Sequence, residues 1–230
     1  MSHIHLPDGV LPVWLWLAGY AATALLVAVL WWRGQATARP RRFARLGIFA
    51  ALMVLIMSIE VPPISYHFNL SVVSGILLGP QLSVLAALMV NIILALIGHG
   101  GITVIGLNTL VLSTEMIIGY AVFRLLTWLR LPLRPAGFVA TLFGLLAGTA
   151  GSYGLIALAR PYIDRVLQTA ELRPGEELGP GIIGTQLDLL RLFILMFGLG
   201  AIGWIVEGIL SSGILGFLQR TDPALLTERE

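Results

Sequence analysis

The chain has 230 residues, of which 57% are hydrophobic and only 11% are charged. Soluble domains carry roughly 25% charged residues, so this composition excludes an ordinary soluble enzyme and predicts an integral membrane protein. The net charge of +2 comes from arginine alone on the basic side, with no basic cluster among aromatic residues, which argues against nucleic-acid binding. Because cysteine is absent, thiolate metal sites and disulfides are excluded.

The first predicted membrane span covers residues 13–32, which is about the length needed to cross a bilayer. Tryptophans lie near both of its ends, as is typical of membrane interfaces. An arginine cluster follows directly, made of Arg33, Arg39, Arg41, Arg42 and Arg45. Because positive residues favour the cytoplasmic side, this cluster predicts that the N-terminus lies outside.

Six more apolar segments follow, at residues 46–59, 70–78, 82–97, 106–129, 138–159 and 182–218. The second of these is too short for an ordinary span and stops at Gly79-Pro80, so we expect a short helix buried among its neighbours. The last is long for one helix and short for two, and we predict one span with a shallow lead-in and possible breaks at its glycines. Residues 160–181 are polar, which predicts an external loop, with one amphipathic turn as the alternative for part of it.

Together these segments predict an all-α integral membrane bundle of about seven transmembrane helices in the cell membrane. The N-terminus is expected outside and the C-terminus inside.

On this topology all four histidines, His3, His5, His67 and His99, lie at the external face. Imidazole is the best ligand for a borderline transition metal that this chain contains. We therefore expect a metal site here. The alternatives are solvated terminal residues for His3 and His5 and a histidine bonded to backbone for His67. His99 is a ligand, an outer-shell residue or a helix cap.

The chain begins Met1-Ser2-His3-Ile4-His5. A terminal amine, backbone amide nitrogens and a histidine in position two or three can wrap a metal in a planar nitrogen set, which favours Ni(II) or Cu(II). With Met1 retained, His3 is third and the chain can close the set alone. With Met1 removed, His3 is second and a distant imidazole, such as that of His67, supplies the fourth nitrogen.

Polar residues within the apolar segments predict contacts between helices. Asn108 and Thr109 are expected to orient loops by hydrogen bonds, as outer-shell groups do around metal ligands. Glu115 and Glu207 are carboxylates in apolar surroundings, and we expect each to bond across helices.

Two spacings indicate further contacts. Asp188 and Arg191 are three residues apart on one helix face and are expected to pair. Gly47 and Ala51 form a small-xxx-small pair that lets another helix approach closely, from within this chain or from a partner. No phosphate-binding Gly-x-x-x-x-Gly-Lys-Ser/Thr loop is present, so the chain itself is not expected to hydrolyse ATP.

The segment His5-Leu6-Pro7-Asp8-Gly9 resembles the His-x-Pro-Asp-Gly start of the CbiM/NikM family. Residues 98–108 resemble that family's Gly-Asp/His-Gly-Gly-Ile-Thr-x-x-Gly-x-Asn block. Its members are the substrate-binding membrane subunits (S components) of energy-coupling-factor transporters for nickel and cobalt. The resemblance implies a single membrane domain over residues 1–230, with a metal-binding segment at 1–12, an extra first helix at 13–32 and the S-component core at 46–219.

The resemblance also implies seven helices, with the N-terminus folded into the bundle from outside. Metal is then bound by the terminal amine, by the amide and imidazole of a second-residue histidine, and by a loop histidine. The loop histidine carries over to His67, and Met1 or Ser2 supplies the amine. The other imidazole is His3 by distance from the terminus and His5 by motif register. We favour His3 with His67 and retain His5 as the competitor.

The implied partners, besides lipid, are a scaffold transmembrane (T) subunit meeting Gly47 and Ala51, two cytoplasmic ATPases and a possible small accessory membrane subunit. No nucleic acid or cofactor is expected, and Ni(II) or Co(II) is the transported ligand. The alternative is a stand-alone, gradient-driven divalent metal transporter with Glu115, Asp188 or Glu207 as a proton relay. An intramembrane enzyme is disfavoured, because no acid–base pair accompanies the histidines.

Overall fold

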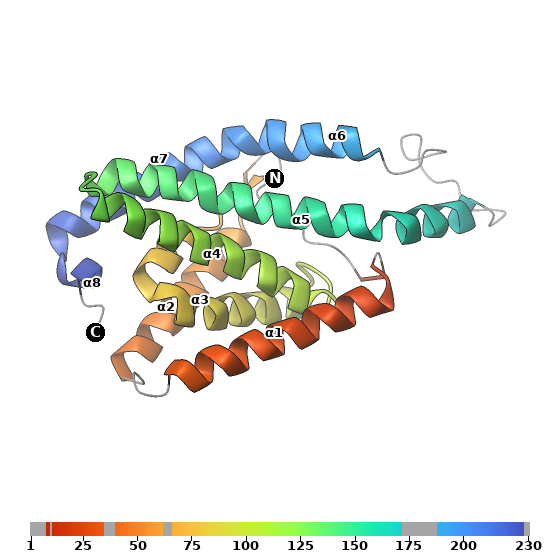
Figure 1. Cartoon of the computed structure of the whole chain (residues 1–230), viewed down its shortest axis with the longest axis horizontal. Helices are drawn as coiled ribbons and strands as arrows, with labels where there is room; N and C mark the ends of the chain where they lie inside the picture. The colour runs from red at the N-terminus through yellow and green to blue at the C-terminus, as the bar shows by residue number, and fades with distance from the viewer. Residues whose placement is uncertain (1–7, 10, 35–39, 62–65, 172–187, 228–230) are drawn as a thin grey trace.

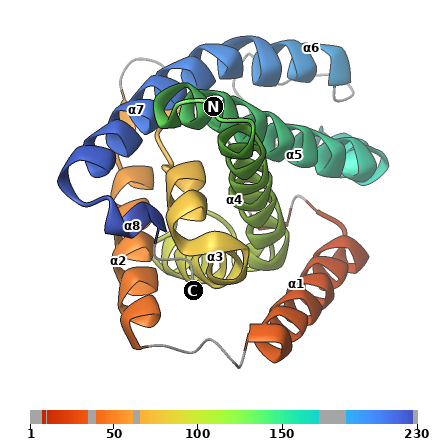
Figure 2. The ribbon, with the colours of Figure 1, turned by 60° about the vertical axis from the view of Figure 1, so that its left-hand side comes forward.

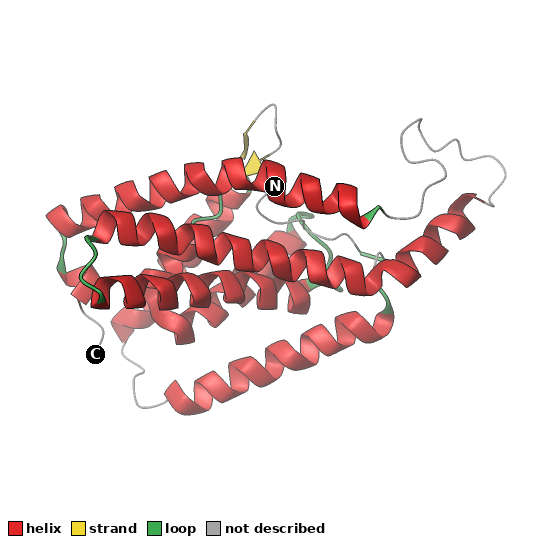
Figure 3. Ribbon diagram, turned by 45° about the horizontal axis from the view of Figure 1, so that its top comes forward, coloured by secondary structure: helices red, strands yellow, loops and turns green. Residues whose placement is uncertain are grey.

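The computed structural model describes residues 8–9, 11–34, 40–61, 66–171 and 188–227, and these form a helical bundle (Figure 1). Its elements are, in chain order, α1 (Val13–Gly34), α2 (Pro40–Met57), β1 (Glu60–Val61), β2 (Tyr66–His67), α3 (Ser71–Leu96), α4 (Ile105–Trp128), α5 (Leu133–Glu171), α6 (Leu189–Phe193), the π-helix η2 (Ile194–Leu199), α7 (Gly200–Thr221) and α8 (Ala224–Thr227). Figure 3 shows how little of the described chain lies outside helices: one short strand pair and the connecting loops.

The described helices are suited to a membrane. Those long and apolar enough to cross one are Val13–Trp32, Ser71–Leu96, Ile105–Trp128, Leu133–Arg165 and Leu189–Thr221, and Phe43–Met57 in α2 is a shorter apolar helix. Many large apolar side chains on them are exposed, which is favourable when the surrounding solvent is lipid. The all-α membrane prediction is confirmed, whereas the number of about seven helices and the sides of the two termini stay predictions.

The third and fourth predicted segments are one helix, α3, bent in its middle. Gly79 has φ 75° and ψ 169°, and Pro80 follows it inside the helix. This backbone geometry is open almost only to glycine, and proline removes a helical hydrogen bond. The helix therefore changes direction at the pair that the sequence predicted as a stop, as Figure 2 shows for the α3 ribbon.

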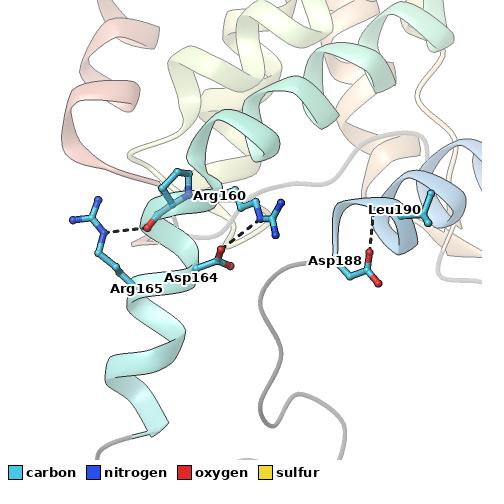
Figure 4. Close-up of polar contacts among 6 residues, drawn as sticks. Arg160, Asp164, Arg165, Asp188 and Leu190 are labelled. Carbon is cyan, nitrogen blue, oxygen red and sulfur yellow. Dashed lines mark hydrogen bonds and ion pairs between the residues drawn. The ribbon is translucent and has the colours of Figure 1, made fainter.

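The predicted loop over residues 160–181 is wrong for its first part, because α5 continues as a helix to Glu171. Pro161 lies inside this helix. Arg160 pairs with Asp164 at 3.5 Å, and Arg165 Nε donates to the Pro161 carbonyl at 3.0 Å (Figure 4). These four-residue spacings support a polar helix. As a result, the far end of α5 extends past the neighbouring helices (Figure 1).

The last apolar segment is continuous from Leu189 to Thr221, and its glycines do not break it. Residues 194–199 are instead wound as a π-helix. Asp188 caps the start, since its Oδ1 accepts from the Leu190 amide at 3.0 Å (Figure 4) and from the Arg191 amide at 3.1 Å. The predicted Asp188–Arg191 ion pair is confirmed at 3.1 Å.

Helix α4 lies at the centre and packs against α1, α3 and α5. Its contact with α1 is close, because a Cβ built on Gly106 would lie 2.6 Å from the Tyr20 nitrogen and 2.7 Å from the Gly19 carbonyl carbon. Small residues of this kind let helix backbones approach in lipid. The contact fixes α1 against the end of α4 that follows the His99 loop.

Candidate metal site

His67 and His99 are brought together from separate parts of the chain. Their ring centroids are 5.0 Å apart, and the ring planes meet edge to face at 80°. Both side chains are half-buried. One lies on β2 and the other in the loop between α3 and α4, so their meeting depends on the tertiary fold. Two of the four histidines predicted to converge therefore do so.

His67 is held on both sides along the chain. Before it, β2 pairs antiparallel with β1, with His67 opposite Glu60. After it, Asn69 Nδ2 donates to Glu115 Oε2 at 2.9 Å. Ser71 Oγ donates to the same oxygen, also at 2.9 Å. The prediction that Glu115 bonds across helices is thereby confirmed.

His99 has a backbone role as well as its ring contact. Its amide donates to the Leu94 carbonyl at 2.8 Å, and the Gly98 amide donates to Ala95 at 3.2 Å. Gly98 has φ +80°. This is a Schellman motif at the end of α3, with glycine in the left-handed position. The cap fixes the direction in which the chain leaves α3, and so the position from which the His99 ring meets His67.

Asp8 binds the loop that follows His99. Its Oδ1 accepts from the Thr103 amide at 2.8 Å and from the Thr103 hydroxyl at 2.6 Å, and its Oδ2 accepts from the Ile102 amide at 3.1 Å. Gly101 makes room for this contact, because a Cβ there would lie 2.5 Å from Asp8 Oδ1 and 2.7 Å from its nitrogen. Asp8 is thus anchored beside the His99 loop.

Hydrogen bonding at this anchor shifts the titration of the carboxyl group. The hydroxyl of Thr103, followed by its amide, lowers the pKa of Asp8 below the ordinary 3.8; the Ile102 amide adds to the lowering, and partial desolvation opposes it. Asp8 is therefore ionised at neutral pH and accepts charge-assisted hydrogen bonds.

Helix α1 also binds this part of the chain. The Tyr20 hydroxyl donates to the Ile102 carbonyl, and Thr23 Oγ1 donates to the Gly106 carbonyl at 2.8 Å. The predicted first helix is therefore more than a membrane anchor, because it holds the segment to which Asp8 binds.

The remaining predicted ligands, Met1, Ser2, His3 and His5, lie outside the described residues, so the choice between His3 and His5 stays open. The part of the chain that the structure describes contains no group of three or more His, Asp or Glu side chains able to hold a metal. Within the described residues, His67 and His99 therefore supply two imidazoles and no third side-chain ligand of this kind lies beside them.

The two predicted outer-shell residues, Asn108 and Thr109, differ in burial. Thr109 is fully buried, and its hydroxyl makes no hydrogen bond within the described part of the chain, whereas Asn108 is half-buried. The outer-shell role of both stays a prediction.

Gly47 and Ala51 are exposed on α2, and a Cβ built on Gly47 would meet nothing within 4 Å among the described residues. The small pair is therefore uncovered within the described chain.

Two carboxylates around the site had no specific role predicted there. In the sequence Asp8 belongs to the His5-Leu6-Pro7-Asp8-Gly9 motif, and the signal for its contact is that Thr103 belongs to the other family motif, at residues 98–108. Glu115 was expected to bond across helices, but its partner beside His67 was not identified. Both contacts join residues far apart in the chain, and periodicity carries no information about such pairs.

The chain is similar to known proteins of metal transport. A family model described as CbiM, cobalt uptake substrate-specific transmembrane region, matches residues 5–225. The putative cobalt transport protein CbiM of Halobacterium salinarum is 25% identical over 235 residues, covering 97% of each chain. A putative metal transport protein of Haloquadratum walsbyi is 32% identical over 127 residues, covering 53% of this chain and 58% of that one.

Two solved structures share the fold. A transition metal transporter superposes with a TM-score of 0.77 at 20% identity, covering 98% of this chain and 97% of that one. A truncated transition metal transporter gives 0.73 at 20% identity, covering 99% and 100%.

Proposed function

The chain belongs to the CbiM family of substrate-specific transmembrane proteins of cobalt uptake, and from this premise we propose that it binds Ni(II) or Co(II) for an ATP-driven energy-coupling-factor importer. It is a multi-pass membrane transport component and not itself an enzyme. Metal capture at the external face by the N-terminal segment and His67 is the proposed first step. Release follows when partner ATPases, acting through a scaffold subunit, reorient the bundle.

The observation that carries this proposal is the meeting of His67 and His99 next to the loop that Asp8 binds. An extended chain spans up to about 3.3–3.6 Å per residue, so either His5, three residues before Asp8, or His3, five residues before it, has a short path to this region. The described anchor therefore supports a site shared between the N-terminal segment and the two loop histidines.

We propose the imidazoles of His3 and His67 as ligands, together with the terminal amine, which Met1 or Ser2 supplies, and the backbone amide nitrogen of His3. His5 is the competitor for His3, and His99 contributes as a ligand or as an outer-shell partner. A nitrogen-rich planar set suits Ni(II), and imidazole is also accepted by Co(II).

The decisive experiment is metal titration of the purified full chain by calorimetry, with Ni(II) and Co(II) in separate runs. We expect about one ion per chain and loss of detectable binding in His67→Ala, because that variant removes a ligand. His99→Ala is the matched comparison, with an expected loss of roughly 10–100-fold if His99 acts in the outer shell. Retained affinity in His67→Ala would remove the proposed site.

The N-terminal ligand is assigned by two further variants and one mass measurement. If His3 is the ligand, His3→Ala abolishes binding and His5→Ala leaves most of it, and the reverse result identifies His5. Intact-mass analysis of the same preparations shows whether Met1 is removed. This matters because the number of chelate rings that His3 can close depends on its distance from the amine.

The gradient-driven alternative is weakened at one of its three relay candidates. Asp188 caps α6 and pairs with Arg191 on an exposed surface, so it does not lie on a buried proton path. Glu115 and Glu207 are buried. Uptake into proteoliposomes that contain this chain alone, driven by a pH gradient, would favour the alternative, whereas a strict need for partner ATPases and ATP supports the importer.

A further inference from the structure

Glu115 is a carboxylate fully buried in a membrane-spanning helix, a position that is costly unless the group is hydrogen-bonded. Its Oε2 accepts from Asn69 Nδ2 and from Ser71 Oγ, each at 2.9 Å. On the other side, a Cβ built on Gly148 of α5 would clash with Glu115 Oε1, so the glycine makes the space that this side chain occupies. Three parts of the fold are therefore shaped around one carboxylate.

The hydrogen bonds of Glu115 reach the chain directly after His67. Asn69 is two residues beyond His67 and is fully buried, as is Ser71. Asn69 Oδ1 also accepts from the Ser71 amide at 2.6 Å, which satisfies one of the free N–H groups at the start of α3. Between them, Leu70 has φ 49°, a left-handed conformation that is uncommon for a residue other than glycine.

We propose that Glu115 is a positioning residue for metal capture, fixing His67 beside His99 through Asn69. The proposal rests on the proposed metal-binding function and adds a residue to it. Glu115 does not bind the metal. It holds Asn69 and the first turn of α3, the backbone leaving His67 is thereby fixed, and the His67 ring meets His99 at 5.0 Å. Asp8 holds the loop that follows His99 through separate hydrogen bonds.

The test measures Ni(II) and Co(II) affinity of the full chain in Glu115→Ala and Glu115→Gln. The alanine variant is expected to bind roughly 10–100-fold more weakly, as when the outer-shell partner of a ligand is lost. The glutamine variant keeps a carbonyl oxygen that can accept from both Asn69 and Ser71, so its affinity should stay close to the wild type. A glutamine variant as weak as the alanine variant would overturn the hydrogen-bond account.

A merely structural role is excluded by two further measurements. Thermal unfolding of the metal-free variants gives a temperature at which each is fully folded, and affinities are compared there. Asn69→Ala should weaken binding about as much as Glu115→Ala, and the double variant should be no weaker than either, because both changes cut one connection. Ser71→Ala is the matched control, since it removes one hydrogen bond of Glu115 and leaves the link to Asn69.

The outcomes separate this inference from the proposed function. A wild-type chain that binds neither Ni(II) nor Co(II) overturns the proposed function, and the positioning role with it. A wild-type chain that binds metal, with Glu115→Ala folded and equally tight, overturns only the positioning role. Independent, multiplying losses in Glu115→Ala and Asn69→Ala overturn it as well.

Discussion

Asp8 connects the start of the described chain to a loop more than 90 residues away, through three hydrogen bonds to Ile102 and Thr103. Its carboxylate can do this because both backbone amides and the Thr103 hydroxyl point to one place and because Gly101 leaves room. If the N-terminal segment carries metal ligands, this anchor limits the positions they can take before metal arrives. Preorganisation of that kind raises affinity by lowering the ordering cost of binding.

Replacing Asp8 by Asn should weaken metal capture, because Asn has one carbonyl oxygen where Asp8 offers two charged ones. We expect a loss on the order of 10-fold, at the low end for residues that orient ligands. The measurement is calorimetric affinity for Ni(II) at neutral pH. Thr103→Val is the matched control, since it removes only the hydroxyl donor and should cost less. An Asp8→Asn chain that binds as tightly as the wild type would show that this anchor does not serve the site.

The anchor should also depend on pH in a defined direction. Because hydrogen bonds from Thr103 lower the pKa of Asp8 below 3.8, the carboxylate form stabilises the docked segment at all pH values above 3.8. That stabilisation is lost only as the pH falls through the lowered pKa. Hydrogen exchange of the Thr103 amide, corrected for its intrinsic rate, should show protection that persists down to about pH 4 and falls below it, and the step should be absent in Asp8→Asn.

At the scale of elements, α1 and α4 are joined by a contact between backbones. A Cβ on Gly106 would lie 2.6 Å from the Tyr20 nitrogen, and neither helix backbone can yield easily at that point. Tyr20 and Thr23 add hydrogen bonds to the Ile102 and Gly106 carbonyls. Helix α1 is thus coupled to the loop that Asp8 binds.

Gly106→Ala should therefore destabilise the protein by about 1–3 kcal/mol, the usual cost of overpacking. It should also weaken metal binding, because the shift of α1 moves the Ile102–Thr103 loop. Thermal unfolding in detergent measures the first effect and metal titration the second. Gly154→Ala on α5 is the matched control, since a Cβ there meets nothing within 4 Å. Equal stability of the two variants would contradict the close α1–α4 contact.

The elements differ in how far the sequence predicted them. Hydropathy placed α1 and α4 within a residue or two of their bounds, because lipid requires a long apolar run. The bend at Gly79-Pro80 was also visible, since both residues are local breakers. The end of α5 was not, because Pro161 and polar composition indicate a loop, whereas the helix there is supported by Arg160–Asp164 pairing.

The candidate site shows the same division. The hydropathy pattern predicts that His67 and His99 lie at the same end of the bundle, and the meeting of their rings agrees with this, whereas the side of the membrane stays a prediction. The contacts Asp8–Thr103 and Asn69–Glu115 did not, because a hydrogen bond between residues 95 or 46 positions apart has no local pattern. Only the folded chain reveals which polar residue in a membrane segment orients which loop.

At the scale of the whole molecule, α2 presents an uncovered face of small residues. Gly47 and Ala51 are exposed, and Ala44 lies one turn before them and is exposed too. Their spacing places them on one side of the helix. Packing within the described chain therefore does not account for this pair, which was the alternative to a partner contact. Small residues let helices approach closely in lipid, and we propose that the scaffold subunit meets this face.

Gly47→Leu should block assembly with the scaffold subunit and leave the isolated chain intact. Leucine has a higher helix propensity than glycine, and a Cβ at position 47 lies more than 4 Å from any other described part of the chain, so thermal stability and metal affinity should not fall. In the membrane, however, a large side chain prevents the close approach of another helix. Co-purification with the scaffold and ATPase subunits, together with metal uptake by cells that express all of them, measures the effect.

Gly213→Leu supplies the matched control for that experiment. Gly213 is an exposed glycine on α7 with equally open surroundings, so leucine there adds the same bulk to a different lipid-facing surface. If α2 is the partner face, Gly47→Leu loses both co-purification and uptake, whereas Gly213→Leu keeps both. Normal assembly of Gly47→Leu would move the partner interface away from α2, and loss in both variants would indicate that added bulk anywhere on the lipid-facing surface is the cause.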